Sequence, residues 1–162
     1  MEIRKATLGD LSVILGIYED ARRYMRENGN LHQWADGYPD ATVVCDDIEK
    51  GICHVCTDED EIVGVFVFFE GEDPTYQKIY EGAWKNDRPY GVIHRIAVAR
   101  HCKGVASFCF DYAYALCKNL KIDTHRDNLP MQGSLAKNGF FRCGIIYLAS
   151  GDERIAYQKS ED

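Results

Sequence analysis

The sequence feature that most constrains the fold is a β-strand that runs through a small-residue turn into a helix. Residues 92–98 are rich in β-branched side chains and predict a buried strand. The turn that follows carries no bulky side chain over the backbone at Gly104 and Ala106. The first N–H groups of a helix lack partners within it and lie at the positive end of its dipole. The segment therefore predicts a diphosphate-binding helix N-terminus, although an ordinary glycine turn fits the same residues.

The rest of the chain predicts an α/β fold around this unit. Only the β-α-β crossover that contains the turn requires parallel neighbouring strands. We therefore expect a mixed, mostly antiparallel sheet with helices on both faces, formed by one domain over residues 1–162. Expected strands are 2–6, 52–57, 62–70, 90–99, 121–124, 140–148 and 153–158, and expected helices are 7–28, 41–50, 105–120 and 129–137.

One of these helices has a regular apolar face. Side chains at alternating intervals of three and four predict that the helix after the turn is buried along one stripe. The stripe comprises Val105, Phe108, Cys109, Tyr112, Ala113, Leu116, Cys117 and Leu120.

Charge and cysteine content narrow the function classes. A net charge of −7 argues against a nucleic-acid partner, which needs a basic face, and favours a cationic substrate. The cysteine count of 7 is odd, and Met1 is followed by Glu-Ile-Arg-Lys instead of an apolar signal segment, so we expect a reduced, cytoplasmic protein. No apolar run approaches the roughly 20 residues that span a bilayer, so no membrane partner is expected. Cys53 and Cys56 lie three apart on a strand and should face opposite sides, so no metal site is expected there.

Two motifs resemble the GNAT superfamily of N-acetyltransferases. The acetyl-CoA binding turn of that family reads Gln or Arg, two residues, Gly, one residue, then Gly or Ala, and here the turn from His101 to Ala106 keeps the small residues. His101 departs from the first position. Residues 122–140 resemble the family's later strand, asparagine, helix and closing Gly-Phe, with Asn128 at the asparagine. Because the order of elements also fits, the resemblance covers nearly the whole chain.

The resemblance implies transfer of an acetyl group from acetyl-CoA to a primary amine of a small molecule or peptide, by direct attack and without a metal. In a GNAT-like sheet, two parallel strands splay apart to admit the cofactor. A non-catalytic acyl-CoA binding or sensing module with the same fold is the alternative, and a longer acyl donor stays open. The residues expected to bind the cofactor are Ile96, Ala97, Val98, His101, Cys102, Lys103, Gly104, Val105, Ala106, Ser107, Asn128 and Lys137.

Histidines are the candidate catalytic bases. His94 lies on the central strand, where period two places it on the same face as Ile96 and Val98. A structural histidine packed in the sheet fits equally well. His125, at the end of the next parallel strand, is the second candidate, with a surface loop histidine as its alternative. Many family members have a tyrosine acid where this chain has Leu135, so the acid is unassigned, with Tyr112 or Tyr114 as alternatives.

The acceptor pocket is expected between loops. Trp34 and Tyr38 lie between the first two helices, the region that lines the acceptor pocket in the family, and Glu81 could form the opposite wall. Packing of the loop beneath the core fits the aromatic residues as well. Asn128 suits a helix cap in addition to a ligand contact. The expected partner is the amine acceptor itself, and a homodimer is left open.

Overall fold

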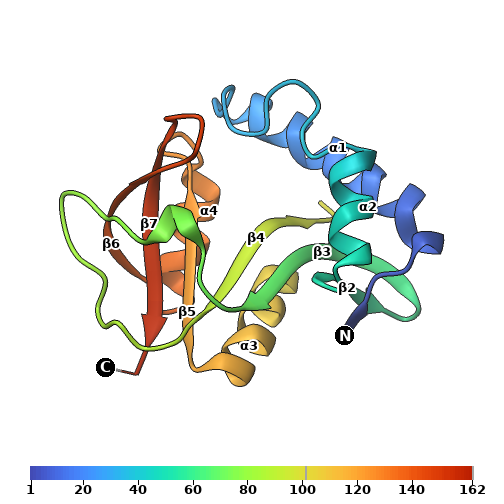
Figure 1. Cartoon of the computed structure of the whole chain (residues 1–162). Helices are drawn as coiled ribbons and strands as arrows, with labels where there is room; N and C mark the ends of the chain where they lie inside the picture. Colours follow the sequence, from blue (N-terminus) through green and yellow to red (C-terminus); the bar gives the residue numbers. More distant parts are fainter. Residues whose placement is uncertain (101, 162) are drawn as a thin grey trace.

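A mixed seven-stranded sheet organises the protein (Figure 1). The computed structural model describes residues 1–100 and 102–161. The strand order is β1-β2-β3-β4-β5-β7-β6, in which β4 and β5 are parallel and the other neighbours antiparallel. The strands are β1 (Glu2–Lys5), β2 (Cys53–Asp58), β3 (Glu61–Glu70), β4 (Gly91–Val98), β5 (Asn119–Thr124), β6 (Phe141–Tyr147) and β7 (Glu153–Ser160). This confirms the expected fold class.

Helices cover both faces of the sheet (Figure 1). The helices are α1 (Leu11–Glu27), α2 (Ala41–Glu49), α3 (Val105–Cys117) and α4 (Leu129–Lys137), with short 3-10 turns η1 (Leu8–Asp10) and η2 (Pro74–Tyr76). Buried side chains of α1 and α2 pack with β2 and β3 in one cluster, whereas α3 and α4 pack in a larger cluster on the opposite face. None of the helices described is long and apolar enough to cross a membrane.

The irregular segment between β3 and β4 completes the face that α1 and α2 leave open. Tyr76 is buried against Val92 of β4 and Ala156 of β7. In the same region the Lys121 ammonium lies 4.1 Å from the ring centroid of Trp84 and 3.9 Å from that of Tyr90. The Lys121 side chain is only 4% exposed, and this burial lowers its pKa to about 8.

The centre of the sheet opens between its two parallel strands. β4 and β5 pair only at Gly91 with Leu120 and Val92 with Lys121, after which the strands diverge. Farther along β4, the two residues Arg95 and Ile96 lie opposite the single residue Phe66 of β3. Arg95 has a φ of 48°, so β4 contains a β-bulge at this point. Beyond Val92, the edge of β4 that faces β5 therefore makes no ladder pairs with it in the described structure.

The helix after the turn is shorter than the apolar stripe predicts. α3 ends at Cys117 because Lys118 adopts a left-handed conformation, and Leu120 belongs to β5, where it is buried. Leu116 is 55% exposed, contrary to expectation, whereas the next residue, Cys117, packs against the core cluster on that side of the sheet. Cys53 and Cys56 do pack in clusters on opposite faces, as strand geometry predicts.

Candidate active site

A cavity of about 410 Å³, here called the turn cavity, lies where β4 leads into α3. Its walls come from α1, the end of β4, the turn before α3 and the first turns of α4. Its lining residues are Ala21, Tyr24, Met25, Glu27, Ile96, Ala97, Val98, Ala99, Arg100, Cys102, Ala106, Asn128, Pro130, Met131 and Ser134. It thus includes the predicted cofactor residues of β4 together with Cys102, Ala106 and Asn128.

The turn itself offers backbone donors to a ligand. Gly104 caps α3 in the left-handed conformation, at φ 76°, and no side chain caps the helix there. A Cβ atom at Gly104 would meet nothing within 4 Å, so the space above the turn is open. The N–H groups of Val105, Ala106 and Ser107 precede the first bond within the helix, from Phe108 N to Gly104 O at 3.1 Å. Such a helix N-terminus suits a diphosphate.

Other predicted cofactor residues near the turn have different positions. Lys103 is exposed, and the buried side chain of Val105 packs in the core, so only its backbone is available to a ligand. Lys137 is exposed at the far end of α4 and does not line the cavity. His101 lies outside the described residues.

A second cavity, of about 580 Å³, lies beside the first and is called the splay cavity. The predicted residues Trp34, Tyr38 and His94 all line it. Both cavities are lined by Met25, Ile96, Asn128 and Met131, so they meet where β4 and β5 diverge. Two ligands, one in each cavity, can therefore approach one another at this point.

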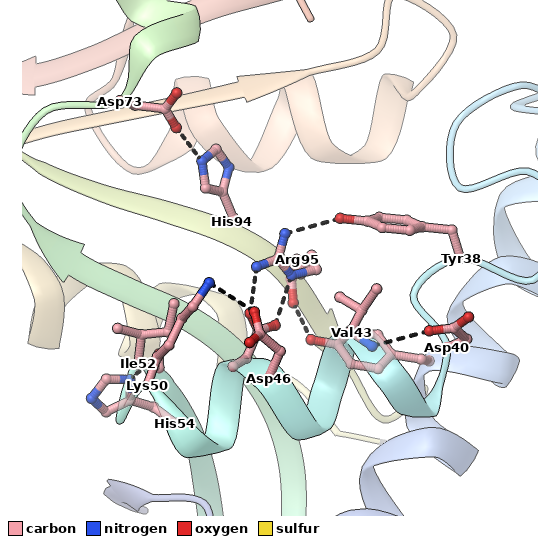
Figure 2. A network of polar contacts seen from close by, with 12 residues as sticks. Tyr38, Asp40, Val43, Asp46, Lys50, Ile52, His54, Asp73, His94 and Arg95 are labelled. Carbon is pink, nitrogen blue, oxygen red and sulfur yellow. Dashed lines mark hydrogen bonds and ion pairs between the residues drawn. The ribbon is translucent and has the colours of Figure 1, made fainter. Parts of the chain in front are cut away.

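His94 forms a close pair with a carboxylate that sequence analysis missed. Its Nε2 lies 2.6 Å from Oδ2 of Asp73, at the start of η2 (Figure 2). The other carboxylate oxygen accepts bonds from the backbone N–H and the hydroxyl of Thr75, at 2.9 and 2.7 Å. Burial opposes ionisation of Asp73, but the bonds from His94 and Thr75 outweigh it and lower the Asp73 pKa to about 2.

This pairing sets the protonation pattern of the imidazole. An ionised carboxylate can only accept hydrogen bonds, so His94 Nε2 must carry the hydrogen. In the neutral ring, Nδ1 then holds the free lone pair and can take up a proton. Because His94 also lines the splay cavity, the arrangement is that of a general base held by a carboxylate.

The β-bulge places His94 on the opposite face of the sheet from Ile96 and Val98, although simple strand alternation predicted one shared face for the three residues. Ile96 packs in the cluster with α3, whereas His94 contacts Asp73 and the ring of Tyr76 on the opposite face. Val98 packs against the α3 cluster as well. The expectation that these three residues share a face is wrong, because the bulge inserts one residue into the alternation.

Arg95, the residue at the bulge, joins the strand to the acceptor-side loop. Its guanidinium bonds both oxygens of Asp47 on α2, at 2.9 and 2.7 Å, and the hydroxyl of Tyr38 at 2.9 Å (Figure 2). The Tyr18 hydroxyl on α1 donates to the Arg95 carbonyl at 2.7 Å. His94 and Arg95 thus point in different directions from β4, one toward η2 and the other toward α2. This network holds the Tyr38 side chain at the wall of the splay cavity.

Asn128 has two structural partners. Its Oδ1 accepts from Met131 N at 3.1 Å, so it caps α4 as anticipated, and its Nδ2 donates to Gln33 Oε1 at 2.9 Å. Asn128 is buried and lines both cavities. It therefore ties α4 to the loop that carries Trp34.

Two other predicted site residues lie elsewhere. Glu81 lines a separate small hollow with Arg142 and Glu153. His125 is not among the residues lining the splay cavity, and its Nδ1 accepts from the backbone N–H of Asp127 at 3.0 Å. Burial, followed by the positive charge of Arg154, lowers the His125 pKa.

The hydroxyl groups that line the turn cavity belong to Tyr24 and Ser134, not to Tyr112 or Tyr114 on α3. Tyr112 packs against His54 and Phe66 instead.

Comparisons with known proteins agree with this geometry. The model of the acetyltransferase (GNAT) family matches residues 14–140. The crystal structure of a GNAT-family acetyltransferase from Streptococcus agalactiae 2603 has a TM-score of 0.90 and 30% identity, over 99% of this chain and 95% of that chain. No curated protein matches the sequence at a significant level.

More distant structures share the fold. A GNAT-family acetyltransferase from Listeria monocytogenes 4b F2365 has a TM-score of 0.70 and 21% identity, over 98% of this chain and 93% of that chain. Arabidopsis thaliana Naa50, in complex with the bisubstrate analogue CoA-Ac-MVNAL, has a TM-score of 0.62 and 14% identity, over 98% and 97%. Because the family model spans most of the chain and a 30% identical relative shares its whole fold, the chain belongs to the GNAT family of acetyl-CoA-dependent N-acetyltransferases.

Proposed function

We propose that this enzyme acetylates a primary amine of a small molecule or peptide, with His94 as the base that receives the amine proton. The observation that carries the proposal is that the two cavities meet, and that the His94–Asp73 pair lines one of them, the splay cavity. The turn cavity suits a nucleotide diphosphate, and the splay cavity suits an amine. Their junction brings an attacking nitrogen and an acyl group together.

The residues present fit acetyl-CoA, which supplies the acetyl group. The open space at Gly104 and the free N–H groups of Val105 to Ser107 suit its diphosphate. The unpaired edge of β4 from Ile96 to Val98 suits the amides of the pantetheine arm, as an added strand would. A backbone N–H near Ala97 or Val98 is the proposed donor to the developing oxyanion.

The amine must lose a proton before or during attack. An ordinary primary amine has a pKa of about 10, so it enters the site protonated. His94 Nδ1 is the acceptor of this proton, and the Asp73 carboxylate stabilises the imidazolium that results. Asp73 remains ionised at neutral pH because its pKa is about 2, so it is a positioning residue throughout the reaction.

The group that protonates the leaving thiolate differs from that in many relatives. Leu135 is fully buried where many family members have a tyrosine. Ser134, one residue earlier, does line the turn cavity, as does Tyr24. We propose that one of these hydroxyls, or solvent that reaches them, replaces the missing tyrosine as proton donor.

Release of free thiol from acetyl-CoA tests the proposal directly. The protein is assayed with polyamines, amino acids, peptides, arylamines and aminoglycosides, with His94→Gln as the matched variant. We expect turnover with at least one class and its loss in the variant, at unchanged CoA affinity. CoA-induced thermal stabilisation without turnover on any amine would favour the sensing module instead.

A further inference from the structure

Arg154 is a buried charged side chain that the catalytic scheme does not use. It lies near the start of β7, is only 8% exposed, and lines the splay cavity. Its Nη1 donates to the neighbouring Glu153 carbonyl at 2.9 Å. Within residues 1–100 and 102–161, no acidic side chain forms an ion pair with its guanidinium.

A buried guanidinium without a counter-ion is costly in a protein interior. Arg95 shows the usual solution, since its largely buried side chain, 19% exposed, is paired to both oxygens of Asp47. Arg154 has no such partner in the described structure, yet it faces a cavity large enough for a small ligand. The missing negative charge is therefore one that a ligand can bring.

A second side chain in the same cavity also lacks a partner. The hydroxyl oxygen of Thr124 is fully buried and has no hydrogen-bond partner among the described residues. Thr124 ends β5, where it pairs with Ile155, the residue next to Arg154 on β7. Paired residues on antiparallel strands face the same side of the sheet, so Thr124 faces the α3 side with Ile155, whereas Arg154 faces the opposite side. Arg154 is therefore the group that can donate to an anionic oxygen in this cavity.

The carboxylates that line the cavity are already engaged. Asp73 pairs with His94, and Asp123 accepts from the Tyr76 hydroxyl at 2.7 Å. Asp152 accepts from the Ser150 hydroxyl at 3.1 Å. These three carboxylates would repel a dianion such as a phosphate monoester but tolerate a single negative charge beside Arg154. They also favour a positively charged amine elsewhere in the same space.

From these contacts we infer that the acceptor is an amine that also carries a carboxylate, of the free amino acid class. The carboxylate binds Arg154, and the amino group reaches His94, which lines the same cavity. This inference rests on the proposed function, because it takes the amino group of the acceptor as the group that is acetylated. It disfavours the N-terminus of a protein, where the carboxyl group beside the amine has become an amide.

The test compares acceptors that differ only in the carboxylate. Each of several free L-amino acids is assayed at neutral pH beside its carboxamide and its decarboxylated amine. For each acceptor kcat/KM is expressed per concentration of neutral amine, so that differences in amine pKa do not enter the comparison. A hydrogen-bonded charge pair is worth about 1.5–3 kcal/mol, so kcat/KM should favour the free acid about 10- to 150-fold. Equal rates for acid and amide would overturn the inference while leaving the proposed acetyl transfer intact.

Variants test which residue causes the preference for acceptors with a free carboxylate. Arg154→Met should reduce the ratio of kcat/KM for acid over amide to near one, whereas Thr124→Val should leave the ratio unchanged, because Thr124 faces the other side of the sheet. Arg142→Gln is the matched control, because Arg142 is an exposed arginine on β6 that lines a different hollow, and it should keep the wild-type ratio. An unchanged ratio in Arg154→Met would contradict the assignment.

A binding measurement separates this inference from the catalytic proposal. N-acetyl amino acids, which keep the carboxylate but have no free amine, should raise the melting temperature of the wild type and not of Arg154→Met. This result supports the carboxylate site even when no amine turns over, in which case only the catalytic proposal fails. No stabilisation by any N-acetyl amino acid, together with no preference among the acceptors, refutes the site.

Discussion

Replacing Gly104 by valine should abolish tight CoA binding while leaving the protein folded. Gly104 has a φ of 76°, and a Cβ there would meet no atom within 4 Å. The substitution therefore costs the protein left-handed strain but no clash, about 1–2 kcal/mol. For a chain of this size that strain lowers the melting temperature by roughly 2–8 °C.

The effect on CoA should be much larger. The valine side chain would occupy the open space in which the diphosphate must approach the N–H groups of Val105 to Ser107. Each hydrogen bond to a charged group is worth about 1.5–3 kcal/mol, so losing even one lowers affinity about 10- to 150-fold. Isothermal titration calorimetry with CoA measures this loss, and a melting curve measures the strain separately.

Gly151→Val is the matched control for the strain. Gly151 has a φ of 90°, its Cβ would also meet nothing within 4 Å, and it lies in the β6–β7 turn, outside the residues lining the turn cavity. It should lose similar stability and retain CoA affinity. If Gly104→Val binds CoA as tightly as Gly151→Val, the assignment of the diphosphate to this turn is refuted.

Three further perturbations test the pairs around the bulge. His94→Gln should lower kcat about 10²- to 10⁴-fold without weakening CoA binding, and steady-state kinetics with calorimetry would expose any loss of affinity that contradicts this. Asp47→Asn removes the counter-charge of the largely buried Arg95 guanidinium and should cost about 3–5 kcal/mol in urea unfolding, whereas Asp46→Asn, in an exposed pair, should change little. The Asp73 pKa is lowered from 3.8 to about 2, so its ionisation stabilises the fold above pH 3.8 and this contribution, about 2 kcal/mol, is lost as pH falls through 2. Asp73→Asn should abolish that part of the acid sensitivity, and an unchanged unfolding profile between pH 2 and 4 would argue against the pair.

The bounds of a helix were predicted well where residues at its two ends cap or terminate it. The bounds of α4 follow from Asn128, whose side chain caps the helix, from Pro130 in the first turn, and from Gly139 after the last. The turn at Gly104 was likewise expected from a strand, small residues and a helix in succession, whereas the splay was expected only from the resemblance to the GNAT family. In each case the determining residues lie within a few positions of the feature that they specify.

The His94–Asp73 pair and the bulge depend on contacts between distant parts of the chain. Asp73 lies in an irregular segment 21 positions before His94, and no periodicity relates the two. Arg95 adopts a positive φ without being glycine, because Asp47, Tyr38 and Tyr18 hold it there. An arginine in a strand does not signal a bulge, so the prediction applied strict alternation across Arg95. Ile96 and Val98 were therefore assigned to the wrong face relative to His94.

The buried lysine between the aromatic rings has a chemical consequence for an enzyme of this kind. Thioesters acylate neutral amines, and a pKa of about 8 gives Lys121 a far larger neutral fraction at physiological pH than an ordinary lysine has. If it were accessible, the Lys121 amine would therefore react readily with the enzyme's own thioester acyl donor. The rings of Trp84 and Tyr90 enclose its ammonium, so a bulky thioester cannot reach it in the folded state. Folding thus shields this reactive amine from self-acetylation, and its labelling by an acylating reagent would report unfolding of the segment that covers it.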